Sequence, residues 1–290
     1  MHYRIRHLTE YDYDSDVLHS YQLLHLVPRP APYQQCLEHQ VTIAPVPLVR
    51  REELDAFGNP VIRVELEHPH RRLTVASEMT IAVHPRAFVP AAQSAPWERV
   101  AAALAWSGRE PAREDLQAGR FRCESPLVRI KRVFGDYAAE CFAPGRPVLE
   151  CADALMSKLH REFTYAPGET HVATPLSEVL QRRRGVCQDF SHLMIACLRA
   201  RGLAARYVSG YVRSASALRG AGASHAWLAL YAPPFGWVEL DPTNHTRVTS
   251  DHVALAWGRD FGDVSPLRGV ILGGSTHRLA VSVQLESGPA

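Results

Sequence analysis

The segment Gly185-Val186-Cys187-Gln188-Asp189-Phe190 decides how this 290-residue chain is interpreted. Apolar residues follow Cys187 at helical spacing, and Gly202 stands where a helix C-cap glycine would, so we expect Cys187 to open a helix. The unpaired amide N–H groups and the dipole at that end of a helix favour a thiolate over a thiol. Gly185 allows a tight turn just before the cysteine, and Asp189 is expected as a helix-start carboxylate. Cys187 is therefore placed where a nucleophile needs to be.

An imidazole and a carboxylate follow on two predicted strands, residues 224–231 and 237–241, joined by a Pro-Pro loop at 232–236. If the loop is centred on Pro233, His225 lies opposite Asp241 and Trp227 lies opposite Glu239. Directly opposed residues share a face, with Cβ atoms about 5 Å apart. Asp241 would then accept one ring N–H of His225 and leave the other nitrogen for Cys187, as in nucleophilic catalysis.

Each of these residue types also has an ordinary structural role. A cysteine on an apolar helix is usually a core residue, which is our interpretation of Cys197. His225 alone would fit a core histidine, and Asp241 alone would fit an Asp-Pro turn. Their predicted pairing favours the catalytic interpretation for Cys187, His225 and Asp241.

Neighbouring residues are candidates for oxyanion or substrate contacts. The main-chain N–H of Cys187 is the expected oxyanion donor, and Gln188 is a second candidate. Tyr165 either offers its hydroxyl to the cleft or packs in the core. Trp227 either lines the substrate groove or belongs to the core, and Glu239 on the same predicted face either binds a substrate amine or is a solvated charge.

The three motifs, Gly-Val-Cys-Gln-Asp-Phe, Ser-His-Ala-Trp at 224–227 and Asp-Pro-Thr-Asn at 241–244, resemble the transglutaminase-like superfamily within the papain-like group of cysteine enzymes. Residues 163–165, 207–212 and 258–260 are also similar to bacterial members, so the resemblance covers nearly the whole chain. It implies helices packed on an antiparallel sheet and a Cys-His-Asp triad. It also implies cysteine-dependent acyl transfer on amide bonds.

The first part of the chain has a different pattern. Residues 1–85 alternate between apolar and polar positions and are punctuated by proline and glycine turns, which predicts an antiparallel β-sandwich or barrel-like domain. This pattern, with Asp55-Ala56-Phe57-Gly58-Asn59 at its centre, is similar to the N-terminal domain that accompanies the bacterial family. We expect an α+β chain divided into a β domain at 1–90, a junction with a short helix at 91–124 and a catalytic domain at 125–290.

Within the second part, helices are expected near 96–106, at 126–141, at 147–163, after Thr174-Pro175 and at 251–257, with a strand at 204–212. The loop 213–223 is rich in small residues and could cover the cleft. Residues 277–285 alternate as a strand that either completes the catalytic sheet or returns to the N-terminal domain.

Composition limits the other classes of function. The formal net charge of +2 gives no reason to expect a nucleic acid or a membrane as partner. The six cysteines show no CxxC pattern, the histidines form no cluster at metal-ligand spacing, and we expect neither a metal nor a cofactor. The N-terminus lacks an apolar signal-peptide core, so a cytoplasmic location is expected. The oligomeric state stays open.

The expected chemistry is attack of a thiolate on the carbonyl of a peptide or protein substrate, which forms a thioester. Hydrolysis of the thioester would make the protein a peptidase or amidase, which we favour, whereas capture by an amine would make it a transglutaminase. Two further alternatives are a catalytically inert binding module and acetyl transfer from a thioester cofactor, although the overall pattern fits arylamine acetyltransferases poorly.

Overall fold

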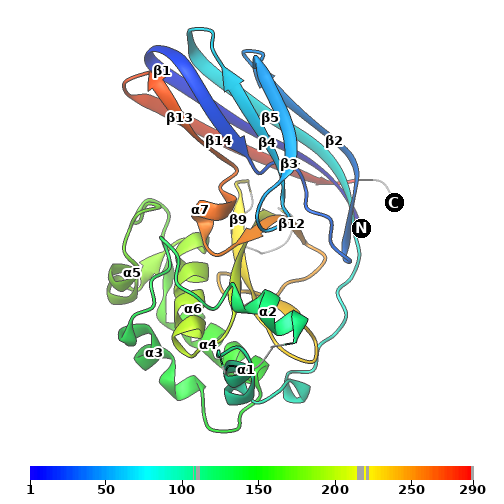
Figure 1. The fold of residues 1–290 in the computed structure, drawn as a ribbon, viewed down its shortest axis with the longest axis vertical. Helices are drawn as coiled ribbons and strands as arrows, with labels where there is room; N and C mark the ends of the chain where they lie inside the picture. The colour runs from blue at the N-terminus through cyan, green and yellow to red at the C-terminus, as the bar shows by residue number, and fades with distance from the viewer. Residues whose placement is uncertain (107, 109–111, 214–218, 220–221, 289–290) are drawn as a thin grey trace.

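The computed structural model describes residues 1–106, 108, 112–213, 219 and 222–288. Figure 1 shows a curved sheet at one end of the molecule and helices packed on a second sheet at the other. The first sheet has seven antiparallel strands in the order β2-β5-β1-β4-β3, with β13 and β14 also paired with β1. Its strands are β1 (His2–Leu24), β2 (Gln34–Ala44), β3 (Val49–Leu54), β4 (Pro60–Leu66), β5 (His70–Val83), β13 (Leu267–Gly273) and β14 (His277–Ser287).

The long strand β1 holds this sheet together. Its first half lies between β5 and β14, and its second half lies between β4 and β13. In β5, Leu73, Val75 and Met79 are buried while Thr74, Ala76 and Glu78 are more exposed, which matches the alternation in the sequence. The predicted antiparallel N-terminal β fold is confirmed, and its form is a half-barrel of one curved sheet.

The strands β13 and β14 settle an alternative that the sequence left open. Both pair with β1, so residues 267–287 return to the first sheet and do not complete the catalytic one. The last strands of the expected catalytic unit, 125–290, therefore pair within the first sheet. The proposed boundaries near residues 90 and 124 remain predictions.

The second sheet is antiparallel, in the order β11-β10-β9-β8-β12, and its strands are β8 (Ala205–Val212), β9 (His225–Tyr231), β10 (Trp237–Asp241), β11 (Thr246–Arg247) and β12 (His252–Gly258). The helices are α1 (Trp97–Ala103), α2 (Arg113–Gly119), α3 (Arg132–Ala138), α4 (Val148–Glu162), α5 (Leu176–Arg182), α6 (Cys187–Ala200) and α7 (Phe261–Val264), with short 3-10 turns at Ala91–Gln93 and Ala139–Cys141. A two-stranded parallel pair joins β6 (Thr164–Tyr165) to β7 (Arg184–Gly185).

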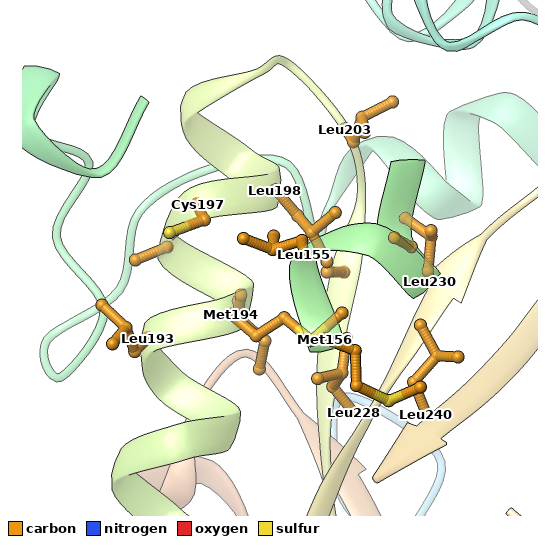
Figure 2. Packing of buried hydrophobic residues seen from close by; sticks show 14 of the residues in the cluster. Leu155, Met156, Leu193, Met194, Cys197, Leu198, Leu203, Leu228, Leu230 and Leu240 are labelled. Carbon is orange, nitrogen blue, oxygen red and sulfur yellow. The ribbon is translucent and has the colours of Figure 1, made fainter. Parts of the chain in front are cut away.

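Helix α6 is central to the core of this part. Figure 2 shows Met194 and Leu198 of α6 directed toward Leu228 of β9 and Leu240 of β10, with Met156 of α4 between them. These side chains are almost fully buried. Because the helix lies on one face of the sheet, its N-terminal residue Cys187 has a fixed position relative to β9 and β10.

The opposite face of the second sheet contacts the half-barrel. Tyr211 of β8 and Val253 of β12 share a buried cluster with Tyr3, Ile81 and Leu285 of the first sheet. The second sheet is thus covered by helices on one side and by the half-barrel on the other. Among the described residues, no helix is both long enough and apolar enough to cross a membrane.

The expected helix at 251–257 is wrong, because this segment forms β12 and pairs with β8. Ala256 belongs to the core on the helical side, whereas Val253 and Leu255 belong to the core shared with the half-barrel. A strand buried on both faces lacks the alternation that would distinguish it from a helix.

The expected helix at 126–141 is shorter, with α3 beginning at Arg132. The main-chain N–H of Leu127 donates to Oδ2 of Asp260 at 2.9 Å, and that of Ser125 donates to the carbonyl oxygen of Val128 at 2.9 Å, so this stretch is held as a loop. The helices expected near 96–106, at 147–163 and after Pro175 are present as α1, α4 and α5. Most of the expected cleft-covering loop at 213–223 lies outside the described residues.

Candidate active site

Cys187 is the first residue of α6 and is half-buried. The turn before it is held by Asp189, whose Oδ2 accepts hydrogen bonds from the main-chain N–H of Val186 at 2.8 Å and from Oγ1 of Thr170 at 2.6 Å. A Cβ atom on Gly185 would lie 2.7 Å from Oδ2 of Asp189, so only glycine allows this close approach. The motif therefore fixes the helix end that carries the thiol.

His225 and Asp241 form a fully buried pair. Nε2 of His225 donates to Oδ2 of Asp241 at 2.8 Å, and both side chains are inaccessible to solvent. His225 begins β9 and Asp241 ends the neighbouring strand β10. The structure thus brings together the imidazole and the carboxylate that the sequence singled out.

The register of the β9–β10 hairpin differs from the predicted one. The hairpin is centred on Pro234, so Asp241 extends β10 opposite Trp227, and Glu239 lies opposite Ala229. This shift of two residues keeps His225 and Asp241 on the same face, because side chains alternate with a period of two. Their contact is a diagonal one, which such pairs can reach with long side chains.

The contact with Asp241 leaves one nitrogen of the His225 ring unused. Its Nδ1 atom is buried and has no hydrogen-bond partner within normal geometry among the described residues. Burial opposes protonation of the ring, but the charge and hydrogen bond of Asp241, together with the nearby Cys187, outweigh it and raise the pKa of His225 to about 10. The Cys187 thiol is therefore close enough to this ring to stabilise its charged form.

Asp241 is held by more donors than the sequence suggested. Its Oδ2 also accepts from Nε2 of His252 at 3.1 Å and from Nδ2 of Asn244 at 2.7 Å, and its Oδ1 accepts from the main-chain N–H of Thr243 at 3.0 Å. Burial would raise the pKa of Asp241, but the charges and hydrogen bonds of His225 and His252 hold it well below its usual range. Asp241 is therefore kept ionised beside His225.

His252 and Asn244 were given no role by the sequence. Asn244 lies three residues after the predicted acid, within the Asp-Pro-Thr-Asn motif, so its proximity was a usable signal. His252 came from a segment that we expected to be helical, which hid its alignment with β8 and with the site.

The spacing of His225, Asp241 and His252 also has the dimensions of a metal site, since one ligand atom from each lies within 4.8 Å of the others. Both histidines already donate from Nε2 to Oδ2 of the aspartate. The hydrogen-bond network explains their spacing without an ion.

Trp227 does not line a groove. It is fully buried, and its ring lies 5.3 Å from that of His252 and 6.1 Å from that of His225. Glu239 is not a solvated charge either, because its buried carboxylate accepts from Oη of Tyr33 at 2.5 Å and from Nη2 of Arg86 at 2.9 Å. Both residues support the site from the side of the half-barrel.

Tyr165 and Gln188 lie near the nucleophile and are half-buried. Gln188 follows Cys187 in the first turn of α6. The ring of Tyr165 packs edge-on against that of Phe190, with centroids 6.4 Å apart. Burial raises the pKa of the Tyr165 hydroxyl, and Cys187 raises it further. Tyr165 is thus a neighbour of the thiol as well as part of the packing.

A thiol at a helix tip, with a His-Asp pair on adjacent antiparallel strands, defines the transglutaminase-like class of folds. Residues 135–242 match the family described as the transglutaminase-like superfamily, and residues 3–82 match the bacterial transglutaminase-like N-terminal region. The chain belongs to this superfamily, as its motifs suggested.

The chain is also similar to other bacterial proteins over most of its length. An uncharacterized protein of Mycobacterium tuberculosis is 38% identical, over 93% of this chain and 87% of its own length. One from Mycobacterium leprae is 31% identical over 97% of each chain. A crystal structure from Cytophaga hutchinsonii, described as a "putative cysteine protease", has a TM-score of 0.77 at 18% identity and covers 100% of this chain and 91% of its own. That last similarity concerns the fold.

Proposed function

We propose that this protein is a cysteine-dependent acyl-transfer enzyme that acts on amide bonds of peptides or proteins and releases the acyl group mainly by hydrolysis. The observation that carries the proposal is the buried His225 ring, which is bonded to Asp241 through Nε2 and has Nδ1 free beside Cys187. An imidazole held in this way has one nitrogen available for proton transfer to and from a thiol.

The pKa of about 10 for His225 favours an imidazolium at neutral pH. A proton released by the Cys187 thiol is therefore retained on the ring, and the thiolate becomes the nucleophile. The thiolate attacks the amide carbonyl carbon, and the imidazolium gives its proton to the leaving amine as the C–N bond breaks. A thioester on Cys187 and a free amine result.

Water completes the proposed cycle. Neutral His225 removes a proton from the water that attacks the thioester, the C–S bond breaks, and a carboxylic acid and free Cys187 are released. The main-chain N–H of Cys187 is the proposed donor to the oxyanion of each tetrahedral intermediate, with Gln188 as the second candidate. Asp241 stays ionised throughout and stabilises the charged ring.

The direct test compares the wild-type protein with Cys187→Ala against a mixed peptide library. Hydrolysis is detected as new carboxyl and amino termini, and transfer as covalent attachment of a fluorescent amine to a Gln-containing peptide. Free carboxylate that depends on Cys187 supports the hydrolase, whereas amine-labelled peptide would show a transglutaminase. If neither product forms, the proposed activity is excluded for the substrates in the library.

Alkylation by iodoacetamide near neutral pH separates an active thiol from an inert binding module. Cys123 is an exposed cysteine of the same chain and provides the internal comparison. Cys197 is a poor comparison because it is fully buried and burial raises its pKa. We expect Cys187 to react faster than Cys123 despite its lower exposure, and a slower Cys187 would contradict an activated thiol.

A further inference from the structure

Arg219 is fixed beside the candidate active site through its main chain. Its N–H donates to Oδ1 of Asn244 at 2.7 Å, and its carbonyl oxygen accepts from Nδ2 of Asn244 at 3.2 Å. The same Nδ2 atom donates to Oδ2 of Asp241 at 2.7 Å. One amide side chain therefore connects the acid of the site to the main chain of Arg219.

The side chain of Arg219 lies over the ring of Tyr165. Its guanidinium carbon lies 5.7 Å from the centre of the Tyr165 ring, within the range of a cation–π contact. Burial raises the pKa of the Tyr165 hydroxyl, Cys187 raises it further, and Arg219 lowers it. Cys187 and Arg219 thus both lie near the same tyrosine.

The charge of Arg219 has no carboxylate partner among the described residues. By contrast, each arginine of the run 182–184 pairs with a glutamate, at 2.8 to 3.2 Å from Glu178, Glu162 and Glu169. Arg219 is exposed, and the loop residues 214–218 and 220–221 are Ser, Ala, Leu and Gly, which carry no charge. Nearby His160, stacked on His245 at 4.9 Å, adds no negative charge. Its pKa is lowered by burial, by His245 and by Arg219.

We propose that Arg219 determines specificity by binding a carboxylate of the substrate next to the amide that Cys187 attacks. This inference rests on the proposed function of Cys187. A guanidinium offers two parallel N–H donors that match a carboxylate, and among the described residues no carboxylate pairs with that of Arg219. The carboxylate belongs either to an acidic side chain or to a peptide C-terminus, and peptides can distinguish these two sources.

The first test uses two alkylating reagents that differ in charge. Iodoacetate carries a carboxylate, and iodoacetamide is its neutral counterpart of the same size. Both reagents react with the same sulfur beside the same imidazole. A change in the reactivity of the Cys187 thiol therefore affects both rates and cancels in their ratio. We expect Arg219→Gln to lower the iodoacetate-to-iodoacetamide ratio about fivefold, and Arg219→Lys to retain most of it. Added salt should weaken the wild-type preference.

The ratio at exposed Cys123 is the control within each variant and should stay constant. Equal ratios at Cys187 in the wild-type protein and Arg219→Gln would overturn the role of Arg219. If instead Cys187 reacts no faster than Cys123 with either reagent in the wild-type protein, the proposed function fails. Because Asn244 holds only the main chain of Arg219, these substitutions leave that contact in place.

The second test uses peptides that Cys187 cleaves. In one set, the residue beside the scissile bond is either Glu, which is anionic, or Gln, which is neutral. In the other set, the peptide ends two residues beyond the scissile bond, either in a free carboxylate or in a neutral amide. We expect Arg219→Gln to lower kcat/KM several-fold for the anionic peptides of only one set, and that set identifies the source of the carboxylate. The neutral peptides should be much less affected. An equal loss on anionic and neutral peptides would contradict recognition of charge by Arg219.

Discussion

The imidazole of His252 donates a hydrogen bond from Nε2 to Oδ2 of Asp241 at 3.1 Å, and both side chains are fully buried. The Nδ1 atom of His252 accepts from the main-chain N–H of Thr249 at 3.4 Å, which leaves Nε2 to donate to Asp241. Asp241 is therefore positioned by His252 on one side while it positions His225 on the other.

Replacing His252 with phenylalanine should reduce the rate at which iodoacetamide alkylates Cys187. A hydrogen bond to a charged group contributes about 1.5–3 kcal/mol, so the loss of orientation of Asp241 should slow the reaction about tenfold. His252→Gln places an amide donor close to the position of Nε2 and should retain more of the rate. A wild-type rate and pH profile in His252→Phe would show that this contact has no effect on the thiol.

The stability of the protein should depend on pH through His225. Its pKa is about 6.5 in an unfolded chain and about 10 in the folded one, so it stabilises the folded state fully below about pH 6.5. That contribution is lost as the pH rises toward 10. We expect the gap in the free energy of unfolding between wild type and Asp241→Asn to narrow from pH 7 to pH 9.5 in urea titrations. A constant gap would indicate that Asp241 does not raise the pKa of His225.

The sequence predicted the contact between His225 and Asp241 even though its register was wrong by two residues. Face assignment depends only on the parity of the strand positions, whereas the register depends on how the Pro233-Pro234 loop closes. The order of residues along each strand therefore predicts which face a side chain occupies. The register depends on loop geometry that the residue types do not specify. The helix tip at Cys187 was predictable for a similar reason, since its signals are local.

His252 and Glu239 could not be placed in the same way, because each depends on contacts from distant parts of the chain. Glu239 is buried by Tyr33 and Arg86, which come from the half-barrel and the segment after it. No local pattern distinguishes such a glutamate from a solvated one. The return of residues 267–287 to β1 was also undetermined, since either sheet could have accepted an alternating strand.

The Glu239 contacts predict a large effect on stability. The side chain of Glu239 is 4% exposed and that of Arg86 is 16% exposed. Glu239→Gln would leave the buried charge of Arg86 without its counterion, and we expect the free energy of unfolding to fall by about 3 kcal/mol. Glu53→Gln is the matched control, because Glu53 pairs with Arg63 at the surface. That control should change stability by less than about 0.5 kcal/mol, and equal losses in the two variants would contradict the importance of burial.

Gly185 should tolerate no side chain. A Cβ atom there would lie 2.7 Å from Oδ2 and 2.8 Å from Cβ of Asp189, so Gly185→Ala must displace the carboxylate that caps the helix of the nucleophile. We expect a loss of about 1–3 kcal/mol in the free energy of unfolding, together with slower alkylation of Cys187. Gly119→Ala, at the end of α2, meets no atom within 4 Å and should be neutral or slightly stabilising. If Gly185→Ala behaved like Gly119→Ala in both measurements, Asp189 would not be what holds the thiol in position. A loss of reactivity at unchanged stability would instead locate the effect at the helix tip itself, because the strain would then move Cys187 relative to His225 without loosening the core.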